Sequence, residues 1–510
     1  MTLSILIWLP LAISLVACLM PRPIVGRFAA VGSLVTLGIA ISFLARFKLG
    51  HAGLQFVTDD VWISALGIHY KLGLDGLNVA LVVLTTVLFS ASLAWASFRE
   101  WPRPRSFYFH FGLAESAVLG AFCAQDLALF IGFFDLMLIP FYFLCGMWGS
   151  GDRVRATTKL VIYTIVGSFF MLAGAVATGV LASNQTGSLT FVISALQQVH
   201  LSHASQDWIF LCFAVAFLVK MPLVPFHGWL ADGYKSMPIP AVAVFSGVVS
   251  KVAAYGFLRI VLPLFPYASV HFQMPMLIIC LVSIMWGTLV AFTTNDSRMV
   301  VAYSSVAQLS FITLGIFALK PTGDQGALLQ MVNHGLVTAP LFFIIAAAAT
   351  RAGGSEDLRD MGGIAFRAPV LASLALIVAL ATLAMPGSSN FIGEFMILLG
   401  VFQSKTAISV IAFLGVVGAA YYALRLFITA FHNRVGRPVA SREIVVAEGI
   451  AIVPIVLVIL VLAFYPQFGL KRSEPSVRAT IASAQAQATA GSAAKVAAAH
   501  RVSSLKVASR

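Results

Sequence analysis

The sequence predicts an all-α polytopic membrane protein, on three observations. Of its 510 residues, 60% are hydrophobic and only 10% are charged, and the mean hydropathy is +0.96. Apolar runs of roughly 20 residues, the length of a membrane-spanning helix, recur from end to end. Two of these runs are interrupted by proline near their middle. We therefore predict about 14 transmembrane helices, arranged as two inverted five-helix repeats that each contain a broken helix.

The predicted spans follow the apolar runs in chain order. They cover residues 2–20, 28–47, 77–98, 107–123, 126–148, 157–182, 207–226, 239–262, 274–294, 298–319, 325–350, 369–400, 406–431 and 446–468. The run over 369–400 is too long for one straight helix, and Met385–Ser389, which contains a proline, interrupts it. The N-terminal run has no basic start and no small-residue cleavage site, so we expect a retained first span.

The two broken runs are five spans apart. Because five is an odd number, successive five-span blocks have opposite orientations in the membrane, as in inverted-repeat transporters. The resulting division has three N-terminal helices over 1–106, a first repeat over 107–268, a second repeat over 269–432, a last helix over 433–470 and a basic tail over 471–510. The tail is rich in Ala and Ser, and we expect it to be flexible or to form a loose surface helix.

Charge in the loops predicts the orientation. The loops after odd-numbered spans hold most of the loop arginines and lysines, so they are expected to face the cytoplasm and both termini the outer side. The net charge of +13 lies largely in these loops and in the tail, which indicates the lipid bilayer as a partner and no nucleic acid. The five cysteines lie singly in apolar runs and predict neither disulfides nor a zinc site.

Four full charges fall at membrane depth: Asp135, Lys220, Lys251 and Glu394. Left unpaired at the bilayer centre, they would together cost on the order of 10–14 kcal/mol. They must therefore pair, become neutral or contact water. Two acids and two amines can pass a proton stepwise, because a change of pairing at one group alters the proton affinity of the next. A static set of salt bridges is the alternative.

Lys220 lies beside a break in its helix. Pro222 follows it closely, and His227 and Trp229 come after a second proline. Proline removes a backbone donor and kinks a helix, which a membrane tolerates only where protein or water satisfies the freed groups. This pattern favours a transport site. A proline kink with a snorkelling lysine is the alternative.

Two further ionisable residues lie at depth. His334, at the centre of the span over 325–350, is a candidate proton relay or a satisfied core histidine. Glu115 is a relay member or caps a polar pocket. Two facing histidines could ligate a haem, but nothing in the sequence fixes a pair. The chain has no Walker A loop, no dinucleotide fingerprint and no cysteine cluster, so we predict no cofactor and no metal in this chain.

Several motifs occur in an order that resembles one family. They are Leu72–Leu77 (LGLDGL), Ala124–Leu127 (AQDL), Asp135–Pro140 (DLMLIP), Lys220–Trp229 (KMPLVPFHGW), Lys251–Gly256 (KVAAYG), Val301–Ser305 (VAYSS) and Asn333–Gly335 (NHG). Over nearly all of residues 1–470 the chain resembles the antiporter-like subunits shared by proton-translocating NADH-quinone oxidoreductase (respiratory complex I) and multisubunit cation/proton antiporters. Glu394 favours the M type, because the L and N types typically carry lysine at that position.

The resemblance implies a membrane-arm subunit in a bacterial inner membrane that moves protons outward, driven by redox chemistry in other subunits. NADH, FMN, iron–sulfur clusters and quinone would belong to partner subunits, and L- and N-type subunits would be its neighbours. A subunit of a multisubunit cation/proton antiporter or of a membrane-bound hydrogenase-type complex is the alternative function. An inactive scaffold is a third, against which the retained membrane charges argue.

The resemblance also implies a role for each charged residue. Asp135 would modulate Lys220, the lysine that holds or releases the proton. Lys251 would be the central relay with His334 beside it, and Glu394 would lie near the exit. Pro222 and Trp229 would shape the broken helix.

The sequence departs from the family at three positions. The family normally has glutamate where this chain has Asp135, often histidine where it has Gln308, and usually proline where it has Ala231. Aspartate still pairs with lysine, but with a shorter reach. Glutamine does not titrate, so one relay position is lost or replaced by water.

Overall fold

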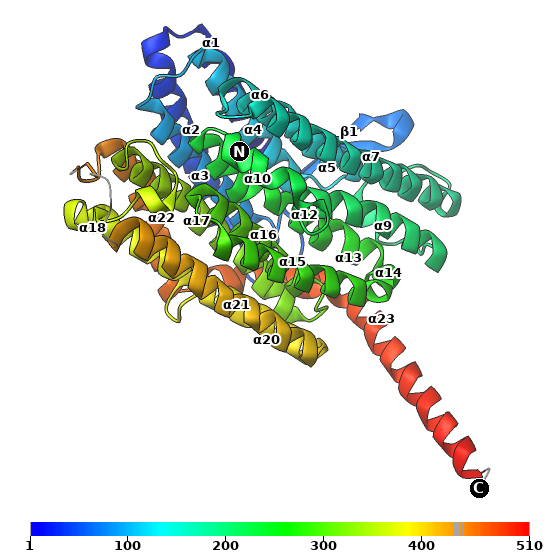
Figure 1. Ribbon diagram of the computed structural model, residues 1–510. Helices are drawn as coiled ribbons and strands as arrows, with labels where there is room; N and C mark the ends of the chain where they lie inside the picture. The colour runs from blue at the N-terminus through cyan, green and yellow to red at the C-terminus, as the bar shows by residue number, and fades with distance from the viewer. Residues whose placement is uncertain (1, 433–438, 441, 509–510) are drawn as a thin grey trace.

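The computed structural model describes residues 2–432, 439–440 and 442–508. They form a bundle of long helices, with α1 and α2 on one flank and α20 and α21 on the opposite flank (Figure 1). The helices of the first half are α1 (Leu3–Leu19), α2 (Arg22–Arg46), α3 (Val79–Ser97), α4 (Pro104–Cys123), α5 (Leu127–Leu136), α6 (Leu138–Trp148), α7 (Arg153–Thr186), α8 (Ile193–Leu196), α9 (His203–Lys220), α10 (Leu230–Ser236), α11 (Ile239–Val244), α12 (Ser250–Gly256), α13 (Leu262–Leu264) and α14 (Pro266–His271). Those of the second half are α15 (Gln273–Thr293), α16 (Ser297–Ile316), α17 (Pro321–Arg351), α18 (Ile364–Arg367), α19 (Pro369–Thr382), α20 (Ser389–Ser404), α21 (Thr406–Phe427), α22 (Val446–Phe464) and α23 (Gln467–Ala508).

The predicted all-α membrane fold is confirmed. Helices lie at every predicted span, and ten helices in the described part of the chain are long and apolar enough to cross a membrane. Two more apolar helices, α1 and α19, are shorter. The exact number of crossings and the inverted repeats stay predictions.

Aspartate side chains fix where some helices begin. Asp126 precedes α5 and accepts hydrogen bonds from the backbone N–H groups of Ala128 (2.9 Å) and Leu129 (3.1 Å). Asp296 caps α16 in the same way. Such N-caps satisfy donors that the first helical turn leaves free.

Both predicted helix interruptions are present. α9 ends at Lys220, and a short 3-10 helix, η2 (Phe226–Trp229), leads into α10. In the second half, α19 ends at Thr382 and α20 begins at Ser389.

The helix predicted over 239–262 contains two π-helical segments that periodicity did not indicate. They are η3 (Phe245–Val249) and η4 (Phe257–Val261), on either side of α12, which carries Lys251. A π turn moves the backbone hydrogen bond from the fourth to the fifth residue, and such turns occur frequently at functional sites.

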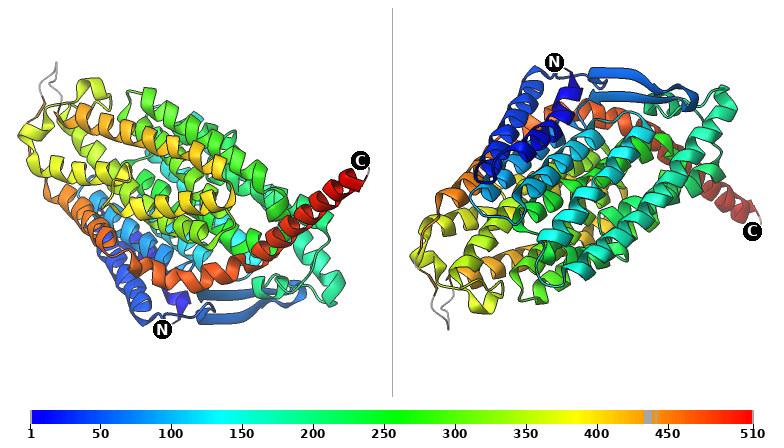
Figure 2. Two further views of the ribbon diagram at one scale, coloured as in Figure 1. Left: turned by 90° about the horizontal axis from the view of Figure 1, so that it is seen from below. Right: turned by 90° about the horizontal axis from the view of Figure 1, so that it is seen from above.

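The sequence analysis missed a β-hairpin between α2 and α3. Strands β1 (Gln55–Ile63) and β2 (Ile68–Leu74) pair antiparallel, with Asp60 opposite Tyr70, along one end of the bundle (Figure 2). Most residues of β1 are exposed. The strand therefore lacks the alternation of apolar and polar residues by which a strand is predicted.

The tail over 471–510, expected to be flexible or a loose surface helix, is helical from its start, and its first part is packed. α23 packs against α17, α13 and α14 before its end projects from the bundle (Figures 1 and 2). Its buried residues include Val477, Ile481 and Ala484. They recur at helical spacing within an otherwise polar segment, so average composition concealed a packed face.

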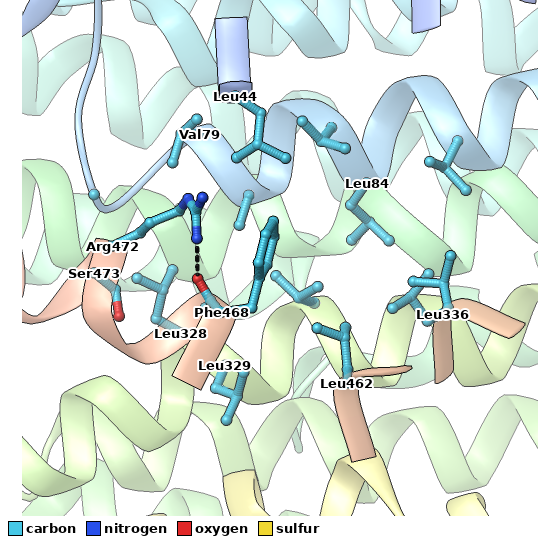
Figure 3. Close-up of a pocket in the computed structure, with 17 residues that line it drawn as sticks. Leu44, Val79, Leu84, Leu328, Leu329, Leu336, Leu462, Phe468, Arg472 and Ser473 are labelled. Atoms are coloured by element: carbon cyan, nitrogen blue, oxygen red, sulfur yellow. Dashed lines mark hydrogen bonds between the residues drawn. The ribbon is translucent and has the colours of Figure 1, made fainter. Parts of the chain in front are cut away.

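The beginning of α23 also closes an apolar cavity of about 120 Å³. Leucines and valines of α3, α17 and α22 line it (Figure 3). Arg472 lies at its edge and donates a hydrogen bond to the carbonyl of Phe468 at 2.7 Å.

Candidate functional site

The break after α9 is held together by specific replacements for the lost helical hydrogen bonds. Pro222 cannot donate to the carbonyl of Leu218, and the N–H of Leu223 takes that acceptor at 3.0 Å. The next carbonyl, that of Val219, accepts from the indole Nε1 of the fully buried Trp229 at 2.9 Å. Two of the carbonyls that the break would leave free are thus satisfied inside the protein.

Lys220 is the last residue of α9, where the helix dipole favours a cation. Its side chain is buried, and Nζ lies 4.8 Å from the centroid of the Phe134 ring. Asp135, which follows Phe134 in the chain, accepts a hydrogen bond from Ser168 Oγ at 2.5 Å. The charges of Asp135 and Lys220 are close enough to interact, but no ion pair joins these two described residues. Asp135 and Lys220 therefore lie near each other without forming a salt bridge.

Lys251 is fully buried on α12. Its Nζ donates a hydrogen bond to the carbonyl of Ser246, five residues earlier in the π segment η3. His334 of α17 lies near enough for the two charges to interact. Its Nε2 contacts Thr338 Oγ1 at 3.1 Å, while Nδ1 has no partner among the described residues. Lys251 and His334 thus lie on segments that pack against each other, since α17 contacts both α12 and η3.

Glu394 is a buried residue in the second turn of α20. Its Oε1 accepts from Gln308 Nε2 at 2.8 Å and from Gln330 Nε2 at 3.4 Å. Its Oε2 is buried and has no partner among the described residues. Glu394 is therefore held through one oxygen, while the other has no hydrogen-bond partner among the described residues.

Polar atoms without partners gather between His334 and Glu394. α17 meets the second helix break here, since Asn333 Nδ2 donates to the carbonyl of Ser389 at 2.7 Å. Within the described residues, the buried side-chain atoms that lack a partner in this region are Gln330 Oε1, Asn333 Oδ1, His334 Nδ1, Ser388 Oγ, Ser389 Oγ, Asn390 Oδ1 and Glu394 Oε2. Buried polar groups are normally satisfied, and ordered water is their usual partner where protein supplies none.

Two other groups of buried charges form direct ion pairs. Arg259 Nη2 lies 2.5 Å from Asp75 Oδ2, and its Nε donates to Tyr255 Oη at 2.9 Å. Arg351 donates to both carboxylate oxygens of Glu448, at 2.9 and 3.1 Å. Neither pair was predicted from the sequence, although Arg259 falls inside a predicted span.

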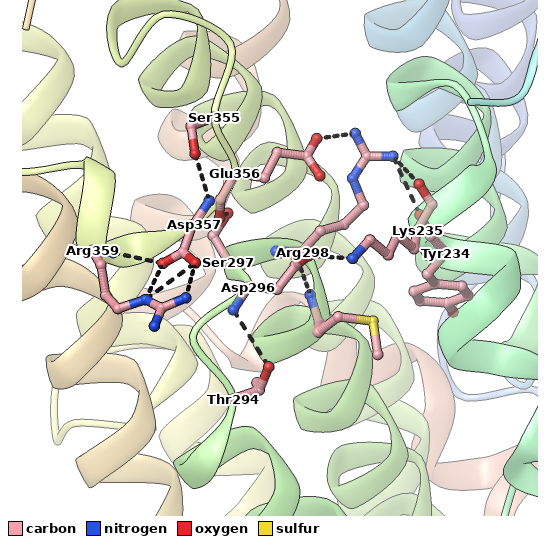
Figure 4. A network of polar contacts seen from close by, with 11 residues as sticks. Tyr234, Lys235, Thr294, Asp296, Ser297, Arg298, Ser355, Glu356, Asp357 and Arg359 are labelled. Carbon is pink, nitrogen blue, oxygen red and sulfur yellow. Dashed lines mark hydrogen bonds and ion pairs between the residues drawn. The ribbon is translucent and has the colours of Figure 1, made fainter. Parts of the chain in front are cut away.

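A polar network joins the end of α10 to the start of α16 (Figure 4). Arg298 pairs with Glu356 and donates to the carbonyls of Lys235 (2.9 Å) and Met237 (3.0 Å). Lys235 in turn lies 2.8 Å from Asp296. These contacts connect the first broken helix to the second half of the chain.

The remaining predicted residues lie apart from these groups. Glu115 is buried beside a small cavity between α1, α2, α3 and α4, near Ser14 and Thr36. His227 Nε2 accepts from Trp286 Nε1 at 2.9 Å. Among the described residues, no group of three or more His, Cys, Asp or Glu side chains is placed to hold a metal ion.

Asp324 is a buried carboxylate that the sequence analysis missed. It is fully buried in the first turn of α17, and neither carboxylate oxygen has a partner in the described part of the chain. The predicted span began at residue 325, so Asp324 counted as a loop residue. The helix begins at Pro321, which suits a first turn because it needs no N–H there.

Comparisons with known proteins show the family of this chain. A family model described as "NADH:quinone oxidoreductase/Mrp antiporter, TM" matches residues 124–420. Two relatives are named NADH-quinone oxidoreductase subunit M. The one from Rhodobacter capsulatus is 34% identical over 517 residues, covering 96% of this chain and 99% of the relative. The one from Escherichia coli (strain K12) is 36% identical over 455 residues, covering 85% and 89%.

Solved structures share the fold of this chain. A chain of "Respiratory complex I from Thermus thermophilus with bound NADH" matches with a TM-score of 0.87 and 29% identity, over 95% of this chain and 100% of that chain. A chain of the Mrp complex from Dietzia sp. DQ12-45-1b matches with a TM-score of 0.80 and 19% identity, over 94% and 52%. At that identity the second likeness shows the fold alone.

Proposed function

The chain belongs to the family of NADH-quinone oxidoreductase subunit M, an antiporter-like membrane subunit of complex I, and we propose that it translocates protons for that oxidoreductase. It would do so in the membrane arm of a multisubunit complex, beside L- and N-type subunits. NADH, FMN, iron–sulfur clusters and quinone would be bound by partner subunits, and their redox chemistry would drive the proton movement.

The contrast between paired and unpaired buried charges carries the proposal. Arg259 and Arg351, both buried, each form a direct ion pair with a carboxylate. Lys220, Lys251 and Glu394 are equally buried, yet none of these described residues forms an ion pair. A buried charge without a counter-ion is costly, and it is relieved by losing or gaining a proton. These three groups are therefore suited to exchange protons rather than to hold the fold together.

The proposed path begins at Asp135 and Lys220. The proton state of Lys220 would respond to Asp135, whose carboxylate is near but not in contact. From Lys220 the path would pass to Lys251 and then to His334, with ordered water completing the gap. It would continue along the unpartnered polar atoms between α17 and α20 to Glu394.

The direction follows from the charge of the loops. The basic loops after odd-numbered spans would face the cytoplasm of a bacterial inner membrane, with both termini outside. Glu394 would then release protons toward the outer side. The antiporter and hydrogenase-type alternative is less well supported, because the two relatives described above, at 34% and 36% identity, are named subunit M of NADH-quinone oxidoreductase.

Lys220→Ala tests the proposal in the assembled complex. We expect NADH-driven proton uptake by inverted membrane vesicles to be nearly abolished, because no other amine of the described residues occupies the break. Lys405→Ala, which removes an exposed lysine, is the matched control and should pump normally. Normal pumping by the Lys220 variant in a fully assembled complex would contradict the proposal.

A further inference from the structure

A basic cavity of about 690 Å³ lies outside the proton path. It is formed where α2 begins, α3 ends and α4 begins. Its charged lining consists of four arginines and one glutamate: Arg22, Arg27, Arg99, Arg103 and Glu100. None of these five described side chains takes part in an ion pair. Four arginines against one glutamate leave the lining with a net positive charge, so a bound anion would stabilise the cavity.

Arg99 and the backbone of the α3–α4 loop are held by specific contacts. The guanidinium carbon of Arg99 lies 4.0 Å from the centroid of the Trp95 ring. Arg103 adopts a left-handed backbone conformation with φ of 52°, which is uncommon for a residue with a Cβ atom. Between them, the carbonyl of Pro102 accepts a hydrogen bond from Trp148 Nε1 at 2.5 Å. Arg99 and the loop backbone are therefore positioned before any ligand arrives.

An apolar stripe leads from this cavity along α2. Ile24 lies between two of the arginines, and it is exposed, as are Val31 and Val35 further along the helix. Spacings of seven and four residues place these three side chains on one face. Since the cavity lies at the ends of three membrane helices, it is at the depth of lipid headgroups and the stripe runs into the hydrocarbon region.

We propose that the cavity binds the phosphate of an anionic phospholipid, whose acyl chains lie along the exposed face of α2. Arginine guanidinium groups match phosphate oxygens in a bidentate geometry. Basic pockets between membrane helices recognise anionic headgroups for the same reason. The continuity of the cationic cavity with an apolar stripe favours an amphipathic ligand over an acidic segment of a neighbouring protein.

Native mass spectrometry of the full chain in detergent tests the proposal. The chain is titrated with phosphatidylglycerol and, separately, with phosphatidylcholine. The test variant is R99Q/R103Q, and R153Q/R155Q, which removes two exposed arginines from the start of α7, is the charge-matched control. We expect preferential binding of phosphatidylglycerol, with an apparent Kd that rises about fivefold for each arginine removed from the cavity. The control should bind like the unmodified chain.

Three results would overturn the proposal. The first is equal binding of the two lipids by the unmodified chain. The second is equal loss of phosphatidylglycerol in the test and control variants, which would indicate non-specific attraction. The third is failure of the R99Q/R103Q chain to enter the oxidoreductase while its lipid binding is unchanged, because the cavity would then be a contact between subunits.

Two further measurements keep the test decisive. Inorganic phosphate at millimolar concentration should displace little phosphatidylglycerol, since the acyl chains contribute to binding; complete displacement would contradict the part assigned to α2. If R99Q/R103Q does not fold, R22Q/R27Q repeats the experiment with two exposed side chains at the start of α2. Binding by that variant equal to the control would also refute the site.

Discussion

Replacing two buried cations by methionine should change stability in opposite directions. Lys220 and Arg351 are both buried, but only Arg351 has a carboxylate partner, Glu448. Methionine keeps an unbranched side chain and removes the charge, so it limits the cavity that alanine would leave. Each variant removes one positive charge. K220M removes an unpaired charge, and R351M removes a paired one.

The expected magnitudes follow from these contacts. An unpaired lysine at membrane depth costs about 2.5–3.5 kcal/mol, and its contact with the Phe134 ring returns about 0.5–2 kcal/mol. K220M should therefore stabilise the chain by ~0.5–3 kcal/mol. R351M leaves Glu448 buried without its partner, which costs about 3–5 kcal/mol.

Thermal unfolding of the full chain in detergent, followed by tryptophan fluorescence, measures both effects. K220M should melt above the unmodified chain and R351M below it. The double variant R351M/E448M should recover most of the loss, because replacing a whole buried pair by apolar side chains is nearly neutral. Shifts of the same sign for K220M and R351M would refute the distinction between unpaired and paired charges.

Two further predictions concern the surroundings of the first break. D135E should pump at close to the unmodified rate in NADH-driven vesicle assays, because the longer acid still reaches toward Lys220; a severe loss would mean that the site is built around the shorter acid and its bond to Ser168. W229F should lower the thermal stability by about 1–3 kcal/mol, because the buried carbonyl of Val219 loses its donor, and unchanged melting would show that another donor replaces the indole.

The broken helices could be predicted from the sequence because their cause is local. Pro222 follows Lys220 within one apolar run, and both residues are costly in a continuous membrane helix. The same reasoning found Glu394 beside the second interruption. In each case the helix is interrupted because of residue types that lie close together in the sequence.

Partners distant in sequence were beyond this reasoning. Arg259 and Asp75 are 184 residues apart, and no local pattern shows that they meet. Without that contact, a paired charge and an unpaired charge look alike in a list of membrane-depth residues. The hairpin and the π segments were missed for a related reason: tertiary packing stabilises them, while their sequences carry no distinct periodicity.

Gln308 shows how the structure changes the meaning of a departure from the family. From the sequence, a glutamine where histidine is often found means the loss of one titratable position. In the structure its Nε2 donates to one oxygen of Glu394 at 2.8 Å, and its Oε1 accepts from Gln330 at 3.0 Å. An amide can fix a carboxylate without taking its proton. We infer that Gln308 orients Glu394 so that proton exchange occurs at its free oxygen, which makes this residue a positioning group rather than a missing relay.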